Sequence, residues 1–150
     1  MERYFEDYVP GSVFEFGHVV VDEAEVIEFA KRYDPQYIHT DPAAAAAGPF
    51  NGLIASGWHT AGLMMRMFVE SYLSEASSLA SPGIDELRWM KPVRPGDRLT
   101  LRATVLQVKR STSKPDRGMV RTFVEVVNGA GEVVMSLKAM NLMRLRNAKV

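Results

Sequence analysis

Apolar residues recur at helical spacing in the first third of the chain. One predicted helix face carries Val26, Ile27, Phe29, Ala30 and Tyr33. Asp22, with Glu25 three positions later, has the pattern of a capping box, so this helix is expected to run from just after Asp22 to about Tyr33. Pro35 ends it, because the residue before a proline is displaced from the α region. Upstream, the β-branched and aromatic residues of 13–20 favour a strand.

Two more helices are predicted before the pattern changes. The shorter one begins at residues 41–42, where an aspartate cap is followed by a proline at the first helical position, and stops near the Gly-Pro pair at 48–49. The longer one begins at about residues 55–57 and continues to about Leu73. Apolar side chains cover most of its circumference, so we expect it to be buried on nearly all sides.

After a polar break at residues 74–83, apolar and polar residues alternate as they do in strands. Strands are expected at residues 87–90, 98–109, 119–127 and 132–145. The Asn-Gly-Ala-Gly segment at 128–131 predicts a hairpin between the last two. One buried helix followed by long antiparallel strands predicts an α+β domain in which a sheet wraps the helix. The open edge of such a sheet is commonly covered by a second copy.

Length and charge narrow the class of protein. A chain of 150 residues suits a single domain spanning 1–150. Lys plus Arg and Asp plus Glu both number 18, so the net charge is zero, and we expect no nucleic-acid partner because such proteins carry a basic excess. Zero net charge also leaves little repulsion between copies, so we expect a homodimer or a higher homo-oligomer.

Cysteine is absent, which excludes disulfides, a thiol nucleophile and cysteine-based zinc sites. This fits a reducing compartment, and we expect a cytoplasmic protein. Residues 1–10 carry three acids and no apolar stretch, so they do not resemble a signal peptide. No window approaches the roughly 18 to 20 apolar residues of a membrane span, so we expect no membrane partner.

The most informative segment lies between the first two helices and reads Asp34-Pro-Gln-Tyr-Ile-His39. A proline-stiffened turn outside regular helix can direct both end residues into the same cavity. A carboxylate and an imidazole there can share proton transfer, because histidine titrates near neutrality. In the alternative interpretation, Asp34 caps a turn and His39 packs against the next helix. Spacing alone favours that alternative.

A second candidate is Ser56-Gly57-Trp58, at the expected start of the long helix. A helix N-terminus offers unpaired N–H groups and partial positive charge, and glycine lets a ligand approach the backbone closely. These groups suit the oxygen of a thioester carbonyl that gains negative charge. The alternative is a tight contact between two helices that requires a small residue at Gly57.

The remaining candidates have structural explanations. We expect His59 to pack in the core or an interface and His18 to be structural, and the histidines lack metal-ligand spacing, so no metal site is expected. Basic residues cluster at 88–98 and 109–117, which indicates either a solvated strand face or a mouth that attracts phosphates. Met64, Met65 and Met67 suit an adaptable acyl pocket or ordinary core filling.

Three ordered motifs together resemble the MaoC-like dehydratase family, which includes the R-specific enoyl-CoA hydratases. They are Asp34-Pro-Gln-Tyr-Ile-His-Thr-Asp-Pro, Gly52-Leu-Ile-Ala-Ser-Gly-Trp-His-Thr and Glu86-Leu-Arg-Trp-Met-Lys-Pro-Val-Arg-Pro-Gly-Asp. The resemblance extends from about residue 8 to residue 145. It implies a hot-dog fold, in which an antiparallel β-sheet wraps a long central helix, and a dimer built on that fold.

By resemblance, Asp34 and His39 are the catalytic pair that hydrates a 2-enoyl-CoA or dehydrates a 3-hydroxyacyl-CoA. The match assigns Gly57 the backbone N–H that polarises the thioester carbonyl, and we expect Ser56 and Trp58 to adjoin the substrate. Coenzyme A enters as the thioester substrate, so no resident cofactor is expected.

Four positions depart from the hydratase pattern. Gln36 and Tyr37 replace an asparagine and a proline, Ser56 stands where a second histidine is frequent, and Met65 stands where some members carry a serine in the site. These departures leave the substrate open. They also leave two alternatives: a hot-dog thioesterase, or a non-catalytic protein that binds acyl-CoA.

Overall fold

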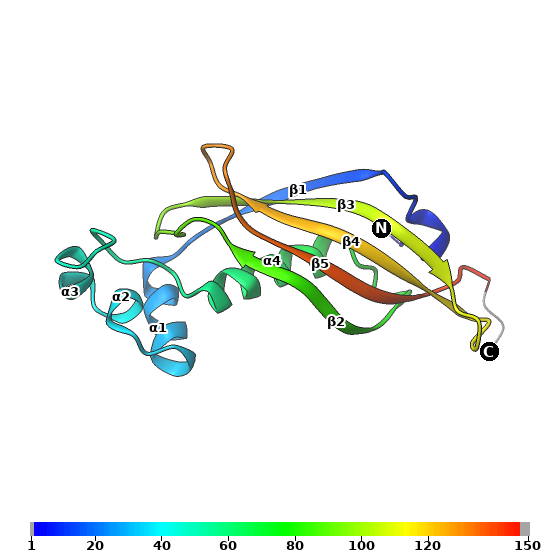
Figure 1. Ribbon diagram of the computed structural model, residues 1–150, viewed down its shortest axis with the longest axis horizontal. Helices are drawn as coiled ribbons and strands as arrows, with labels where there is room; N and C mark the ends of the chain where they lie inside the picture. The colour runs from blue at the N-terminus through cyan, green and yellow to red at the C-terminus, as the bar shows by residue number, and fades with distance from the viewer. Residues whose placement is uncertain (1, 148–150) are drawn as a thin grey trace.

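One five-stranded antiparallel sheet curves around helix α4 in the computed structural model, which describes residues 2–147 (Figure 1). In chain order the elements are η1 (Phe5–Asp7), β1 (Val13–Val20), α1 (Glu23–Tyr33), α2 (Tyr37–Thr40), α3 (Pro42–Ala46), α4 (Gly57–Ser71), β2 (Ser78–Trp89), β3 (Arg98–Arg110), β4 (Arg117–Val127) and β5 (Val133–Arg144). The strand order is β1-β3-β4-β5-β2, with every neighbouring pair antiparallel. The predicted α+β architecture is confirmed.

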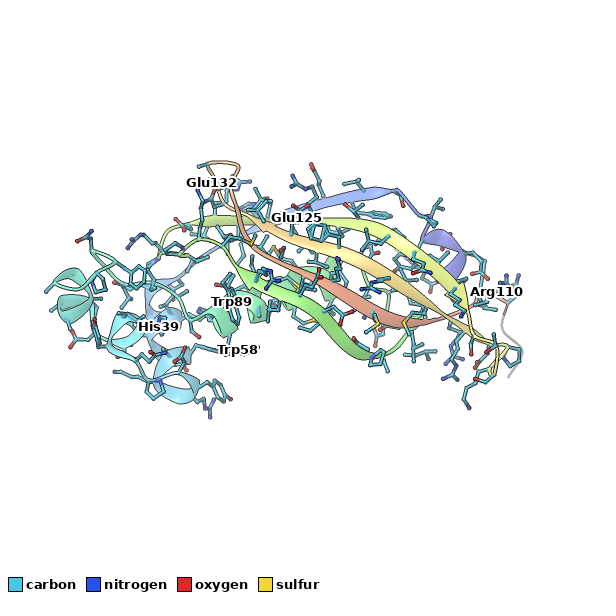
Figure 2. All side chains as sticks on the ribbon, in the orientation of Figure 1. His39, Trp58, Trp89, Arg110, Glu125 and Glu132 are labelled. Atoms are coloured by element: carbon cyan, nitrogen blue, oxygen red, sulfur yellow. The ribbon has the colours of Figure 1, made fainter. Side chains whose placement is uncertain are left out.

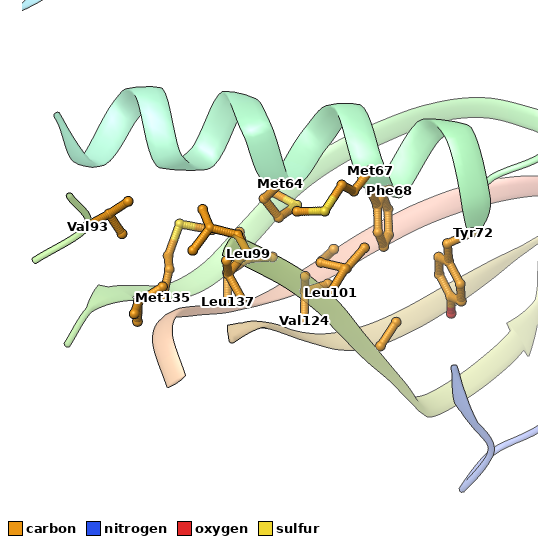
Figure 3. Close-up of a cluster of buried hydrophobic side chains, with 14 of the residues drawn as sticks. Met64, Met67, Phe68, Tyr72, Val93, Leu99, Leu101, Val124, Met135 and Leu137 are labelled. Carbon is orange, nitrogen blue, oxygen red and sulfur yellow. The ribbon is translucent and has the colours of Figure 1, made fainter. Parts of the chain in front are cut away.

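The core lies between α4 and the concave face of the sheet. Figure 3 shows side chains of α4 directed at those of the strands. They include Met64, Met67 and Phe68 on the helix and Leu99, Leu101, Val124, Met135 and Leu137 on the sheet. Buried and partly exposed residues alternate along β3, β4 and β5, as expected for strands with one face on the core. Burial of this apolar surface is the main force that holds helix and sheet together.

Helix α4 is not buried on nearly all sides, so that prediction is wrong. Trp58, Met65 and Val69 expose 59 %, 44 % and 52 % of their surface. A single sheet covers only one side of a helix, and the apolar residues on the opposite side therefore face outward. None of the helices described between residues 2 and 147 is long and apolar enough to span a membrane.

Strand β2 begins at Ser78, inside the segment that was expected to be a polar break before a short strand at 87–90. The sequence misleads here because β2 is an edge strand that pairs only with β5. An edge strand tolerates Pro82 and polar residues, because the backbone groups on its open side form no hydrogen bonds with a neighbouring strand. The pairing is interrupted by register shifts, and Glu86 adopts a positive φ of 53° beside one of them.

The contacts confirm the predicted Asp22 cap and the β4–β5 turn, whereas the predicted capping box is wrong. The Asp22 carboxylate accepts a hydrogen bond from the Glu25 N–H and so caps α1, while the Glu25 carboxylate contacts His59 instead of completing a capping box. The Asn128 side chain accepts hydrogen bonds from the N–H groups of Ala130 and Glu132, which fixes the turn of the β4–β5 hairpin.

The N-terminal segment packs on β4 through a close contact between Phe5 and Gly118. A Cβ atom on Gly118 would overlap the Phe5 ring. We therefore expect Gly118→Ala to lower the free energy of unfolding by about 1–3 kcal/mol, the usual cost of overpacking a filled site. Urea denaturation checks this. Gly17→Ala is the control, because a Cβ there meets open space; equal stability of the two variants would contradict the contact.

Candidate active site

Asp34 and His39 lie close together in the chain, at the end of α1 and in the one-turn helix α2 that follows. Asp34 is the C-cap of α1, and its N–H donates to the Ala30 carbonyl. The chain then turns at Pro35 and starts the one-turn helix α2, which contains His39. His39 was expected outside regular helix, and this is corrected: its N–H donates to the Gln36 carbonyl, so a new turn forms directly after the proline.

The two side chains meet, as the predicted catalytic pair requires. Asp34 Oδ2 lies 3.4 Å from His39 Nε2. His39 is buried, whereas Asp34 keeps partial access to solvent. An imidazole and a carboxylate at this separation, facing a cavity, can act on the same substrate group.

The main chain selects the tautomer of His39. Its Nδ1 lies 2.7 Å from the carbonyl oxygen of Ile54. A carbonyl oxygen only accepts, so Nδ1 must carry the hydrogen and donate it. In the neutral ring the lone pair is then on Nε2, the nitrogen that faces Asp34. Two hydrogen-bond acceptors thus face each other across a gap, an arrangement suited to a water that donates to both.

Two neighbours stabilise the charged form of Asp34. The Gln36 side-chain amide donates to Oδ1 and the Ser56 hydroxyl donates to Oδ2, each at 2.7 Å. These hydrogen bonds, first that of Gln36 and then that of Ser56, hold the pKa of Asp34 below its usual value. Asp34 is therefore a carboxylate near neutral pH. From the sequence, Gln36 was only a departure from the pattern and Ser56 was expected beside the substrate. Their contacts with the Asp34 carboxylate were missed, and Ser56 does not line the cavity.

Ser56 is also the N-cap of α4. Its oxygen accepts a hydrogen bond from the Trp58 N–H at 3.3 Å, while its hydroxyl donates to Asp34. Ser56 is fully buried behind the carboxylate. Gly57 follows as the first residue of α4, where N–H groups have no intrahelical partner and the helix dipole is positive.

The small size of Gly57 is required by a tryptophan. A Cβ atom at this position would overlap the Trp89 indole, whose Nε1 donates to the Gly57 carbonyl at 2.9 Å. The tight contact weighed from the sequence therefore exists, but with strand β2 and not with another helix. Trp58 meets the same indole edge to face, with ring centroids 5.1 Å apart.

These residues surround a cavity of about 400 Å³. Its lining includes Asp34, His39, Gly57, Trp58, Thr60 and Trp89. Figure 2 shows His39, Trp58 and Trp89 at the same end of the molecule, where the short helices meet the start of α4. A mostly apolar cavity with a few convergent polar groups is the usual form of a small-molecule site.

Other residues singled out in the sequence lie outside the reacting groups. His59 is buried, with Nε2 2.8 Å from a Glu25 carboxylate oxygen and its ring stacked on Phe29, as expected for packing. Met65 lies outside this cavity, on the exposed side of α4. Among residues 2–147, no group of three or more acidic or histidine side chains is arranged to hold a metal ion.

The lowered pKa of Asp34 predicts how stability depends on pH. The folded state favours the ionised carboxylate, so its contribution is present above the unfolded pKa of about 3.9 and is lost as pH falls through the lower folded value. Asn in its place does not titrate. The stability advantage of the wild type over Asp34→Asn should therefore shrink between about pH 5 and pH 3. Urea titrations at each pH measure it, and a constant difference would contradict the assignment.

Known proteins resemble this chain in sequence and in fold. The chain is 34 % identical over 114 residues to the 3-hydroxyacyl-thioester dehydratase Z of Mycobacterium tuberculosis, covering 75 % of this chain and 76 % of that protein. A crystal structure of a MaoC-like dehydratase from Rhodospirillum rubrum is 37 % identical, with a TM-score of 0.88 over 97 % of this chain and 99 % of that one.

A more distant structure shares the fold. The R-hydratase PhaJ1 from Pseudomonas aeruginosa is 24 % identical and superposes with a TM-score of 0.76 over 95 % of this chain and 85 % of its own. The family model described as "MaoC like domain" matches residues 7–128. The chain therefore belongs to the MaoC-like dehydratase family and has its hot-dog fold.

Proposed function

We propose that the protein is a hydro-lyase that adds water reversibly across the double bond of a 2-enoyl-CoA thioester. The observation that carries this proposal is the pair of acceptors formed by Asp34 Oδ2 and His39 Nε2, 3.4 Å apart at the wall of the cavity. Such a pair orients a water, and the neighbouring start of α4 provides donors for a carbonyl oxygen. The dehydratase name of a relative that is 34 % identical supports the same reaction class.

In the forward direction, a water donates one hydrogen to Asp34 and the other to His39. As its oxygen bonds to the β-carbon, one of these two groups takes the proton that leaves the water. The electron pair of the carbon–carbon double bond moves toward the thioester carbonyl and gives an enolate. The α-carbon then receives a proton from the Asp34–His39 pair, so one water is added and both side chains return to their starting state.

The enolate oxygen is stabilised by the N-terminus of α4. The Gly57 N–H belongs to the first turn, where the helix dipole favours negative charge. The carbonyl must therefore lie beside Gly57 while the β-carbon faces the acid/base pair. Trp58 and Trp89 line this end of the cavity, where their rings contact each other.

We also propose that two copies of the chain pair through one apolar surface. It consists of the exposed apolar residues Trp58, Met65 and Val69 on α4 with Ile84 and Trp89 on β2. Its two parts are continuous, because Trp58 contacts Trp89 and because Met65 and Ile84 line one cavity. An apolar surface of this kind usually marks an interface.

Loss of either catalytic side chain is expected to remove activity. Asp34→Asn cannot accept a proton and His39→Ala removes the second acceptor that orients the water, so each should slow hydration of crotonyl-CoA by at least about a hundredfold. The fall in enoyl absorbance measures the rate. Asp85→Asn and His18→Ala, which change the same residue types far from the cavity, should keep wild-type rates.

Two outcomes would overturn the proposal. If both active-site variants hydrate crotonyl-CoA at the wild-type rate, Asp34 and His39 are not the catalytic pair. If the wild-type protein releases free coenzyme A from acyl-CoA substrates, detected with a thiol reagent, and leaves the double bond intact, it is a thioesterase.

The proposed dimer is tested by a charge on its surface. The wild-type protein should sediment with twice the mass of one chain, and Val69→Lys should shift it toward the monomer because a buried lysine is costly. Leu106→Lys is the matched control, since Leu106 is 42 % exposed on β3, away from α4. A wild-type monomer, or equal dissociation of both variants, would contradict the interface.

A further inference from the structure

A second, smaller cavity of about 80 Å³ lies between α4 and the sheet. Its walls include Met64 and Phe68 of the helix, Val124 and Leu137 of the sheet, and Ile84 of the edge strand. Figure 3 shows the first four of these side chains facing one another across the helix–sheet interface. One water needs on the order of 15 Å³, so the cavity has room for several atoms.

The polar side chain of Asn141 faces this apolar cavity. Asn141 lies on β5, is 5 % exposed and lines the cavity. Its Oδ1 has no hydrogen-bond partner among residues 2–147. Burial of an unsatisfied amide oxygen is unfavourable, and folded proteins almost always pair such groups with protein, water or a ligand. The position therefore requires a partner that the described chain does not provide.

The second cavity follows the catalytic one along the same two elements. Gly57 and Thr60 of α4 line the catalytic cavity, and Met64 lines the second; on β2, Trp89 lines the first and Ile84 the second. Met64 is seven residues beyond Gly57, roughly 10 Å along the helix axis. A chain whose carbonyl lies beside Gly57 and that passes along α4 from the first cavity into the second brings its far end to Asn141.

We infer that Asn141 is a specificity residue that selects 2-enoyl thioesters with a neutral hydrogen-bonding group, such as a hydroxyl, near the end of the acyl tail. This inference rests on the hydratase function proposed above. A tail hydroxyl donates to Oδ1 and completes the hydrogen bonding of the amide. A plain alkyl tail leaves the oxygen unsatisfied and displaces any water that paired with it.

The selected group is neutral because the lining of the cavity is uncharged. It consists of Met64, Met65, Phe68, Ser81, Ile84, Val124, Leu137, Ala139 and Asn141. A carboxylate or ammonium group would lose its hydration there without gaining an opposite charge. A hydroxyl also tolerates either orientation of the Asn141 amide, because it can both donate and accept.

The test compares paired substrates: 2-enoyl-CoA thioesters with plain tails and the same tails with a terminal hydroxyl. The wild-type protein should prefer the hydroxylated member by roughly ten- to a hundredfold in kcat/KM for the chain length that reaches Asn141. Asn141→Leu, similar in size but apolar, should reverse the preference. Met143→Leu is the control and should keep it, since Met143 is buried on the same face of β5 but does not line the cavity.

Calorimetric binding of the saturated acyl-CoA pairs gives the same comparison without turnover. Tighter binding of the hydroxylated member by the wild type, lost in Asn141→Leu, supports the inference even if that variant is inactive. Equal kcat/KM and equal affinity of the wild type for both members overturn the inference and show that Asn141 is paired by water only. Hydration of the plain substrates would then leave the proposed function intact. Absence of hydration with every substrate overturns the proposed function instead.

Discussion

The hydroxyl of Ser56 connects the two parts of the molecule on which its chemistry depends. Its oxygen caps α4, the helix around which the sheet is built, and its proton is donated to Asp34 at the end of α1. The position of the carboxylate is thus tied to the first turn of the core helix. The same bond, together with the stronger effect of the Gln36 amide, holds the pKa of Asp34 below its usual value, so Ser56 acts on both the position and the acidity of this carboxyl.

Much of the fold could be predicted because its signals are local. Asp22 and Asp41 begin helices where their side chains were expected to cap them, and the alternation along β3 and β4 follows directly from burial of one face. Strand β2 was placed too late, because an edge strand has few pattern requirements. The exposure of one side of α4 was missed, because an apolar residue on a helix has the same sequence pattern whether it packs in the core or faces outward.

Only part of the candidate site could be predicted from the sequence. The five-residue spacing of Asp34 and His39 indicated a pair, and the family resemblance selected it over the capping alternative. The tautomer of His39 depends on the Ile54 carbonyl, fifteen positions away, and the hydrogen bond that holds the Asp34 carboxylate comes from Ser56, twenty-two positions away. Such contacts exist only after the chain has folded. The same holds for Asn141, whose unsatisfied oxygen becomes apparent only when its surroundings are known.

The contact between Gly57 and Trp89 links two positions that are far apart in the chain. The indole occupies the space that any side chain at position 57 would need. A larger residue at 57 is therefore compatible only with a smaller one at 89, so a change at 57 requires an accompanying change at 89. Since Trp89 also lines the cavity beside Asp34 and His39, such a joint exchange would reshape that cavity at the point where the helix begins. Divergence at this pair would thus couple the backbone at the start of α4 to the size of the group that fits beside it.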